Sequence, residues 1–272
     1  MGIGFESARS CLSYGANVVL CARGEEALSQ AARDLTKEHP AERIKTLTAD
    51  VGEESDVERI FDYVIASFGA CNGIIHAAAV LGPIGPVAEV EDPELWWDTL
   101  RINLFGTFLV TRAAARRMKA TSGGRIVLYA GGGASAPFPN YTAYACSKVA
   151  VVRFTETVAV ELAPEIEVNC LAPGLVATRM QQQTLAAGDR AGAEYLETTK
   201  NALAQGAAVS PKLAAETSAF LASDAARGIT GKFVSARFDG YAEWPEHLAE
   251  LRDTDIFTLR RILPRDRGMD WQ

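Results

Sequence analysis

The sequence predicts an α/β protein built on a parallel sheet, and three observations support this. Short, continuously apolar runs alternate with amphipathic helical stretches along most of the chain. Continuous apolarity is typical of strands that are covered by helices on both faces. The chain has 272 residues, of which 48% are hydrophobic and 22% charged, as in an ordinary globular protein. No internal repeat or linker divides the chain, so one large domain is expected.

The elements are predicted in order from periodicity and from the residues that end each run. Helical periodicity predicts helices at 4–13, 25–38, 54–68, 94–120, 143–162 and 213–222. Continuous apolar runs predict strands at 17–22, 44–49, 73–78, 125–130, 167–171 and 232–236. Pro40 and Gly69 are expected to end the second and third helices. A charged tail begins at Trp244, so we expect a domain over residues 1–240 and a C-terminal extension over 241–272.

Charge and cysteine usage argue against several kinds of partner. Lys and Arg number 27 and Asp and Glu 34, a net charge of −7, so no general attraction to nucleic acid or anionic membranes is expected. The five cysteines are widely spaced without a CxxC pair, and the three histidines are scattered, which argues against disulfides and a metal site. No apolar run reaches the ~18 residues of a membrane span, and no signal peptide is evident. We therefore expect a cytoplasmic protein.

The segment Tyr144-Ala-Cys-Ser-Lys148 carries the most informative chemistry. Residues four apart share one face of a helix. An ammonium near a phenol favours the phenolate and lowers the tyrosine pKa. Tyr144 is therefore predicted to exchange a proton with a substrate hydroxyl or carbonyl. The spacing alone is a weak signal, because chance supplies many such pairs.

Four further motifs stand in order around this segment. They are Gly2-Ile-Gly4 at the first helix, Asp50-Val51 at a strand end, Asn103 in Arg-Ile-Asn-Leu-Phe-Gly, and Asn169-Cys-Leu-Ala-Pro-Gly174. With five motifs in register over residues 1–240, the chain resembles the classical short-chain dehydrogenase/reductase family. The resemblance implies a Rossmann-like doubly wound parallel sheet and a bound nicotinamide cofactor.

The resemblance also implies roles for single residues. Tyr144 is expected to be the catalytic acid/base, and Lys148 to lower its pKa and hold the nicotinamide ribose. Asn103 is expected to anchor a water that relays protons from Lys148 to solvent. The remaining cofactor contacts implied are Gly2, Ile3 and Gly4 at the phosphates, Asp50 and Val51 at the adenine, Ala77 at a strand end, and Pro173, Gly174, Val176 and Thr178 along the nicotinamide.

Arg23 decides which cofactor is expected. Family members that bind NAD often carry an acidic residue after the second strand, where it accepts from the ribose 2′-hydroxyl. Here that position is Ala22, followed by Arg23, which suits a 2′-phosphate. We expect NADP (NADPH) over NAD. A solvated Arg23 at the start of a helix is the alternative.

Two substitutions depart from the family pattern. The family serine, 13 residues before the tyrosine, is Gly131 here, while Ser135 stands nine residues before Tyr144. Losing one hydrogen-bond donor would remove about 2–4 kcal/mol of transition-state stabilisation unless a glycine-loop N–H, Ser135 or a substrate hydroxyl replaces it. Gly131 and Ser135 are therefore candidate substrate contacts. The usual Asn-Asn-Ala-Gly reads His76-Ala-Ala-Ala79, and we expect His76 to be a strand-end side chain bonded to backbone.

The third departure is that the family's first strand and first loop glycine are missing. Either the sequence is an incomplete record of a longer protein, or the chain is short and has a rearranged sheet and weak cofactor binding. Without that strand, neighbouring strands would expose unpaired backbone groups.

The expected function is that of an NADP-dependent oxidoreductase. It would interconvert a ketone and a secondary alcohol on a small substrate, and polar residues in 177–206 suggest a polar one. The family resemblance implies a homodimer or homotetramer. Two alternatives stay open: a binding or scaffold protein that has lost catalysis, and a non-redox lyase or isomerase that reuses Tyr144.

Overall fold

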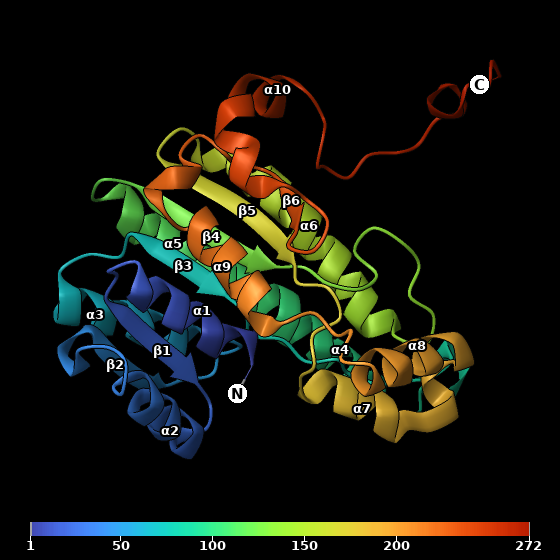
Figure 1. The fold of residues 1–272 in the computed structure, drawn as a ribbon, viewed down its shortest axis with the longest axis horizontal. Coiled ribbons are helices and arrows are strands. Elements are labelled where there is room, and N and C mark those ends of the chain that lie inside the picture. The colour runs from blue at the N-terminus through green and yellow to red at the C-terminus, as the bar shows by residue number, and fades with distance from the viewer. Residues whose placement is uncertain (1, 272) are drawn as a thin grey trace.

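The structure, a computed structural model, describes residues 2–271 and contains six parallel strands (Figure 1). They are β1 (Val18–Ala22), β2 (Ile44–Thr48), β3 (Gly73–His76), β4 (Gly124–Tyr129), β5 (Ile166–Ala172) and β6 (Phe233–Ser235). The helices are α1 (Ile3–Ser13), α2 (Glu25–Leu35), α3 (Glu54–Phe68), α4 (Pro93–Leu100), α5 (Gly106–Lys119), α6 (Thr142–Leu162), α7 (Arg179–Ala187), α8 (Ala193–Ala204), α9 (Pro211–Leu221) and α10 (Leu248–Asp253). The α/β class predicted from the sequence is confirmed.

The strands form two sheets rather than one. β3, β4, β5 and β6 pair in that order, whereas β1 pairs with β2 alone within residues 2–271. Helix α1 packs against β1, β3 and α9 and so connects the two sheets. In the described part of the chain no strand lies between β1 and β3, so the two sheets share no backbone ladder.

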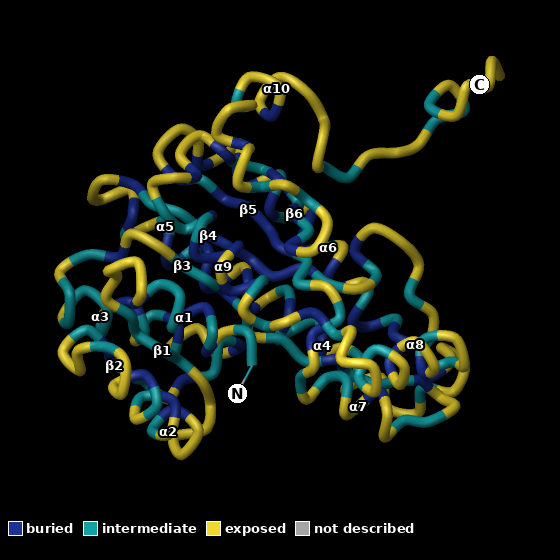
Figure 2. Tube along the Cα trace, in the orientation of Figure 1, coloured by how far each residue is buried: buried dark blue, intermediate teal, exposed yellow. Residues whose placement is uncertain are grey.

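Helices cover both faces of the four-stranded sheet. In β4, Ile126 and Leu128 pack with α3, α5 and α6, while Val127 and Tyr129 pack with α9 on the other face. This alternation is what a strand buried on both faces requires. Figure 2 shows the buried residues concentrated along these strands. A separate cluster joins α1 and α2 to the two-stranded sheet.

Several boundaries differ from the predicted ones. The helix expected over 94–120 is broken into α4, a π-helical turn over Arg101–Phe105, and α5. The strand expected over 73–78 ends at His76, and the second helix ends at Leu35 rather than at residue 38. Each remaining predicted helix or strand lies within two residues of its prediction at either end, as element boundaries usually do. Helices α7, α8 and α10 were not predicted.

The predicted C-terminal extension is partly packed against the domain. Trp244 and Leu251 are buried with α9 and β6, and α10 lies within this segment. Leu259 is held to α6, since its N–H donates to Glu156 and its carbonyl accepts from Arg153. Beyond it the chain extends away from the domain (Figure 1). No helix within residues 2–271 has the length and apolarity that crossing a membrane would need.

Candidate active site

Helix α6 brings Tyr144 and Lys148 together on its buried face. Both side chains are buried, and the Lys148 Nζ lies 5.6 Å from the centroid of the Tyr144 ring. The Lys148 ammonium donates a 2.7 Å hydrogen bond to the carbonyl of Tyr129, the last residue of β4. The pair therefore lies at the carboxyl end of a central strand, which is where ligands bind in open parallel sheets.

Burial controls how both groups titrate. Desolvation lowers the pKa of Lys148 to about 8. Desolvation also raises the pKa of Tyr144 above its ordinary value, and the phenol of Tyr195 adds to this effect. The lowering of the Tyr144 pKa that we expected from Lys148 does not set the direction of the shift, because burial of the phenol dominates it. Tyr144 is therefore a protonated phenol near neutral pH and suits the role of a proton donor.

Gly131 lies directly against the Tyr144 hydroxyl. A Cβ built on Gly131 would collide with the Tyr144 Oη and contact the ring at 3.3 Å from Cζ. The position at which the family carries serine is therefore next to Tyr144, and the hydroxyl here uses the room that a side chain would need.

Ser135 lies on a different surface. It is exposed and lines a groove with Cys146, Val149 and Leu259. Cys146 and Val149 lie on the exposed side of α6, whereas Tyr144 lies on its buried side. The structure thus brings Gly131, but not Ser135, next to the tyrosine.

Asn103 is completely buried in the π-helical turn between α4 and α5. Its Oδ1 accepts from the Val80 N–H at 2.8 Å. Its Nδ2 donates to the Val80 carbonyl at 2.8 Å and to the Ser147 Oγ at 2.9 Å. The carboxamide therefore connects the loop after β3 to α6, one turn from Tyr144, and three of the four hydrogen bonds it can make are formed within the protein.

His76 differs from its expected environment. The side chain is 7% exposed, and its Nε2 is enclosed with no hydrogen-bond partner among residues 2–271. The expected bond from this nitrogen to backbone is therefore absent. Burial, together with the nearby Lys148 charge, lowers the pKa of His76 to about 4, so the ring is neutral. A buried polar atom without a partner calls for a physical explanation.

An apolar cluster that the sequence did not reveal covers Tyr144. Phe138 and Tyr141 stack with ring centroids 4.3 Å apart, and Tyr195 of α8 meets Phe138 edge-on at 4.7 Å. Leu81 and Leu196 belong to the same cluster. Phe138 and Tyr141 lie just before α6. Their closeness to Tyr144 in the sequence was the one signal that could have placed them near it. Tyr195 lies in α8, far from Tyr144 in the sequence, and gave no such signal.

The residues expected to hold the phosphates and the adenine lie at the start of α1 and at the ends of β1 and β2. Gly2 precedes α1 in an extended conformation, no side chain caps the first turn, and a Cβ on Gly4 would lie 3.6 Å from Ala77. Arg23 follows β1, and its Nη1 lies 3.8 Å from the Asp50 carboxylate after β2. An uncapped helix start and a nearby exposed guanidinium fit the phosphates of a dinucleotide.

The segment expected along the nicotinamide follows β5. Gly174 has a φ of +77° and packs closely on Val209, while Val176 forms a parallel bridge with the same valine. Thr178 precedes α7, and its Oγ1 donates to Gln181 at 2.9 Å. Pro173 directly precedes this turn. Val51, after β2, contacts Gly106 of α5 through its carbonyl.

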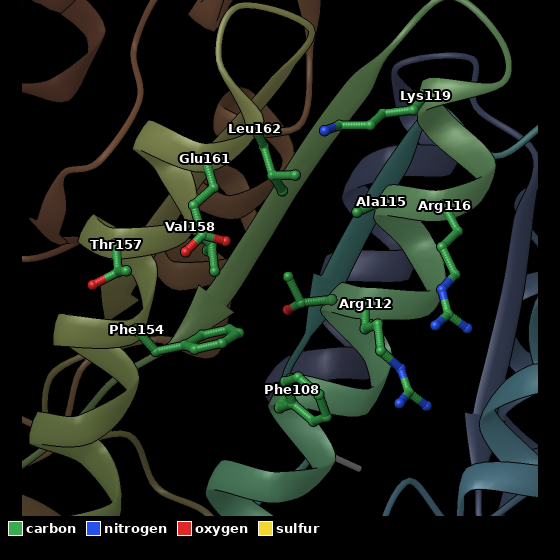
Figure 3. Close-up of a pocket in the computed structure, with 11 residues that line it drawn as sticks. Phe108, Arg112, Ala115, Arg116, Lys119, Phe154, Thr157, Val158, Glu161 and Leu162 are labelled. Carbon is green, nitrogen blue, oxygen red and sulfur yellow. The ribbon is translucent and has the colours of Figure 1, made fainter.

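A groove away from Tyr144 lies between α5 and α6 (Figure 3). Its volume is about 450 Å³, and Phe108, Phe154 and Leu162 form its apolar floor. Arg116 and Lys119 project from the α5 wall, and Glu161 from the α6 wall. The exposed position and the absence of Tyr144 from its lining make it a candidate contact surface rather than part of the active site.

Comparison with known sequences gives a coherent result. The family described as enoyl-(acyl carrier protein) reductase matches residues 1–236. Dehydrogenase/reductase SDR family member 4 of Sus scrofa is 33% identical over 234 residues, covering 86% of this chain and 81% of that protein. The Homo sapiens protein of the same name gives the same identity and coverage.

Solved structures share the fold. A variant of actinorhodin polyketide ketoreductase with NADPH superposes with a TM-score of 0.77 at 30% identity, covering 86% of this chain and 91% of that one. NAD⁺-bound xylitol dehydrogenase gives a TM-score of 0.76 at 27% identity, covering 86% of this chain and 92% of that one. Both cofactors are thus represented among similar structures.

Proposed function

Because the chain belongs to the short-chain dehydrogenase/reductase family and is an NAD(P)-dependent oxidoreductase, we propose that it reduces a small ketone to a secondary alcohol with NADPH. The observation that carries the proposal is the buried Tyr144–Lys148 pair at the end of β4, with the phenol held in its protonated form. A protonated phenol can donate to a carbonyl oxygen, which is the step that reduction requires.

A bound nicotinamide cofactor supplies the hydride in this chemistry. Tyr144 donates its proton to the substrate oxygen, and the Lys148 ammonium stabilises the phenolate that is left. The aromatic cluster over Tyr144 excludes water and strengthens these electrostatic interactions. With Gly131 in place of serine, polarisation of the carbonyl depends on Tyr144 itself and on nearby backbone N–H groups.

We favour NADPH because of Arg23, whose side chain is 60% exposed beside the strand end where a ribose 2′-phosphate would lie. Its contact with Asp50 is a loose 3.8 Å pair between an exposed guanidinium and a half-buried carboxylate, so a phosphate could replace it at little cost.

For the substrate, the surroundings of Tyr144 favour an apolar ketone over the polar one expected from residues 177–206. Gln182 and Gln183 are exposed, and Gln181 is bonded to Thr178. The side chains that do gather around Tyr144 are aromatic and aliphatic.

We also propose that the α5/α6 groove pairs with the same groove of a second copy. In a two-fold arrangement, the basic α5 wall of one copy would face Glu161 of the other. Phe108 and Val160 are exposed on the same two helices, Phe105 is exposed at the end of the turn before α5, and pairing would bury them.

The test combines cofactor binding with turnover. Fluorescence titration is expected to show tighter binding of NADPH than of NADH, and a panel of simple ketones and diketones should give oxidation of NADPH at 340 nm. Tyr144→Phe should bind NADPH normally and lose about 10²–10⁴-fold in turnover, while Tyr14→Phe, at an exposed tyrosine, should match the parent. Absence of nucleotide binding would favour the scaffold alternative, and normal turnover by Tyr144→Phe would refute the proton-donor role.

A further inference from the structure

Three buried hydroxyl groups lie between the four-stranded sheet and the helices α1 and α9. They belong to Ser7 of α1, Tyr129 of β4 and Ser218 of α9, and we call them the hydroxyl cluster. The Tyr129 Oη donates to the Ala214 carbonyl at 3.1 Å, and the Ser218 Oγ donates to the Ala215 carbonyl at 2.9 Å. The core around them is built from apolar side chains. The reaction proposed above makes no use of these hydroxyls.

The hydrogen bonds of the hydroxyl cluster connect α1 to α9. The Oγ atoms of Ser7 and Ser218 lie 3.0 Å apart. Because the Ser218 proton goes to Ala215, the Ser7 hydroxyl is the donor in this bond. The Ser7 Oγ also lies 3.5 Å from the Tyr129 Oη. Each hydroxyl proton therefore has an acceptor, and a satisfied buried network specifies one arrangement of the elements that it joins.

Tyr129 also holds Lys148, through its main chain. Its carbonyl accepts the 2.7 Å hydrogen bond from the Lys148 ammonium. The backbone at this point is fixed, because Leu128 pairs with β3 and Tyr129 itself pairs with β5. One residue of a central strand thus holds the lysine of α6 by its carbonyl and the helices on the opposite face by its hydroxyl.

Helix α1 depends on such an anchor for its exact position. In the part of the chain that the structure describes, the β1–β2 sheet shares no backbone ladder with β3–β6. Apolar contacts hold α1 against α9, but they are non-directional and do not fix its register. Ser7 lies one helical turn after Gly4, so its hydrogen bond fixes the start of α1, where the cofactor phosphates are expected to bind.

We propose that the hydroxyl cluster sets the distance between the phosphate-binding start of α1 and Lys148, which makes Tyr129 a positioning residue for the dinucleotide. The inference rests on the proposed function, because that function places the two ends of one cofactor at these two points. A dinucleotide that spans both points is sensitive to their spacing, whereas a fragment that reaches only one of them is not. Burial raises the pKa of Tyr129 to about 12, so the hydroxyl keeps its proton near neutral pH.

The first test compares NADPH with a fragment of it. Tyr129→Phe removes the Oη, and Ser7→Ala removes the α1 end of the cluster. In each variant the NADPH Kd should rise about fivefold, the effect of one net hydrogen bond, while the Kd of adenosine 2′,5′-bisphosphate should stay within about twofold. The kcat at saturating NADPH should also stay within about twofold of the parent value. Tyr241→Phe, at a partly buried tyrosine in the same core, is the matched control.

The fragment separates a change of spacing from a general disturbance of α1. Equal weakening of NADPH and of the bisphosphate would overturn the proposal, and so would an unchanged NADPH Kd in both variants. Combining Tyr129→Phe with Ser7→Ala should weaken NADPH binding less than the two single effects together, because the hydroxyls act as one unit. Additive losses, or loss of folding in both single variants, would make the cluster an ordinary packing feature.

The second test needs no cofactor. In Tyr129→Phe the backbone amides of α1 should exchange with deuterium about fivefold faster than in the parent, while those of α6 and β5 stay unchanged. Unchanged exchange in α1, or equally faster exchange in all three elements, would overturn the anchoring role. A parent that binds no NADPH removes the proposed function, yet this measurement still decides whether the cluster holds α1. A parent that binds NADPH, with unaffected variants, keeps the function and removes the positioning role.

Discussion

Gly131 is the residue whose lack of a side chain matters most for the geometry of the site. The Tyr144 hydroxyl lies where a Cβ on this residue would project. The sequence indicates only that the serine of the family is replaced by glycine. In the structure, the Tyr144 hydroxyl lies so close to Gly131 that no side chain fits between them. The substitution therefore affects the position of the proton donor as well as the number of donors.

Gly131→Ala is expected to displace the Tyr144 hydroxyl and to lower kcat about tenfold, because a small misplacement of a reacting group is costly. NADPH affinity should be unchanged, since the glycine faces the tyrosine. Steady-state kinetics with a binding titration measures both. Gly240→Ala, where an added Cβ meets nothing closer than 3.9 Å, is the control. Unchanged kcat in Gly131→Ala would mean that Tyr144 moves freely.

The pH dependence of reduction should follow Lys148. An ordinary lysine keeps its proton to about pH 10.4, but burial lowers the pKa of Lys148 to about 8. The kcat should therefore be maximal below pH 8 and fall as the pH rises through this value. The reason is that a neutral lysine amine cannot stabilise or reprotonate the Tyr144 phenolate. A kcat profile between neutral and alkaline pH checks this, and a rate that stays constant to pH 10 would contradict it.

Contacts within the site could be predicted from the sequence only where the two residues are close together in the chain. Tyr144 and Lys148 share one helix, and the prediction that they lie together follows from helical geometry alone. The raised pKa of Tyr144 and the orphaned His76 nitrogen depend on burial by elements far away in the sequence, including α8 and β4. Local patterns carry no information on such burial.

Among the elements, the π-helical turn between α4 and α5 has the clearest functional consequence. The sequence predicts one continuous helix over 94–120, because the apolar periodicity continues on both sides. The turn at Arg101–Phe105 interrupts it, and Asn103 within the turn bonds to the loop after β3 and to α6. Such turns in helices frequently occur at functional sites. The interruption rests on tertiary hydrogen bonds that helical periodicity cannot reveal.

Asn103→Ala should lower the free energy of unfolding by about 2–3 kcal/mol, since it removes three hydrogen bonds and leaves the half-buried Val80 N–H and carbonyl without their side-chain partner. It should also lower turnover by loosening α6 near Tyr144. Chemical denaturation measures the first effect and kinetics the second. Asn201→Ala removes an exposed amide bonded only to Glu197 and should change neither. A stability equal to that of the parent would show that the three bonds contribute nothing net.

At the scale of the whole molecule, the α5/α6 groove determines what the protein is expected to assemble with. Phe108→Asp places a charge in the floor of the groove and should convert a dimer to a monomer, as measured by sedimentation equilibrium. Val87→Asp, at an exposed loop position on another surface, should leave the mass unchanged. A parent that sediments as a monomer would contradict the proposed pairing.

Because the strands form two separate sheets, the molecule has two structural units that should differ in the free energy of local opening. The β1–β2 pair and α2 have no backbone ladder to β3–β6 within residues 2–271, and α1 provides much of their attachment. A two-stranded sheet is marginal by itself, so this unit should open locally at a smaller free-energy cost than the four-stranded sheet. Arg23 and Asp50 belong to it. A dinucleotide that bridges Arg23 and Lys148 would therefore act as a thermodynamic clamp, and ligand concentration would set how often the unit opens.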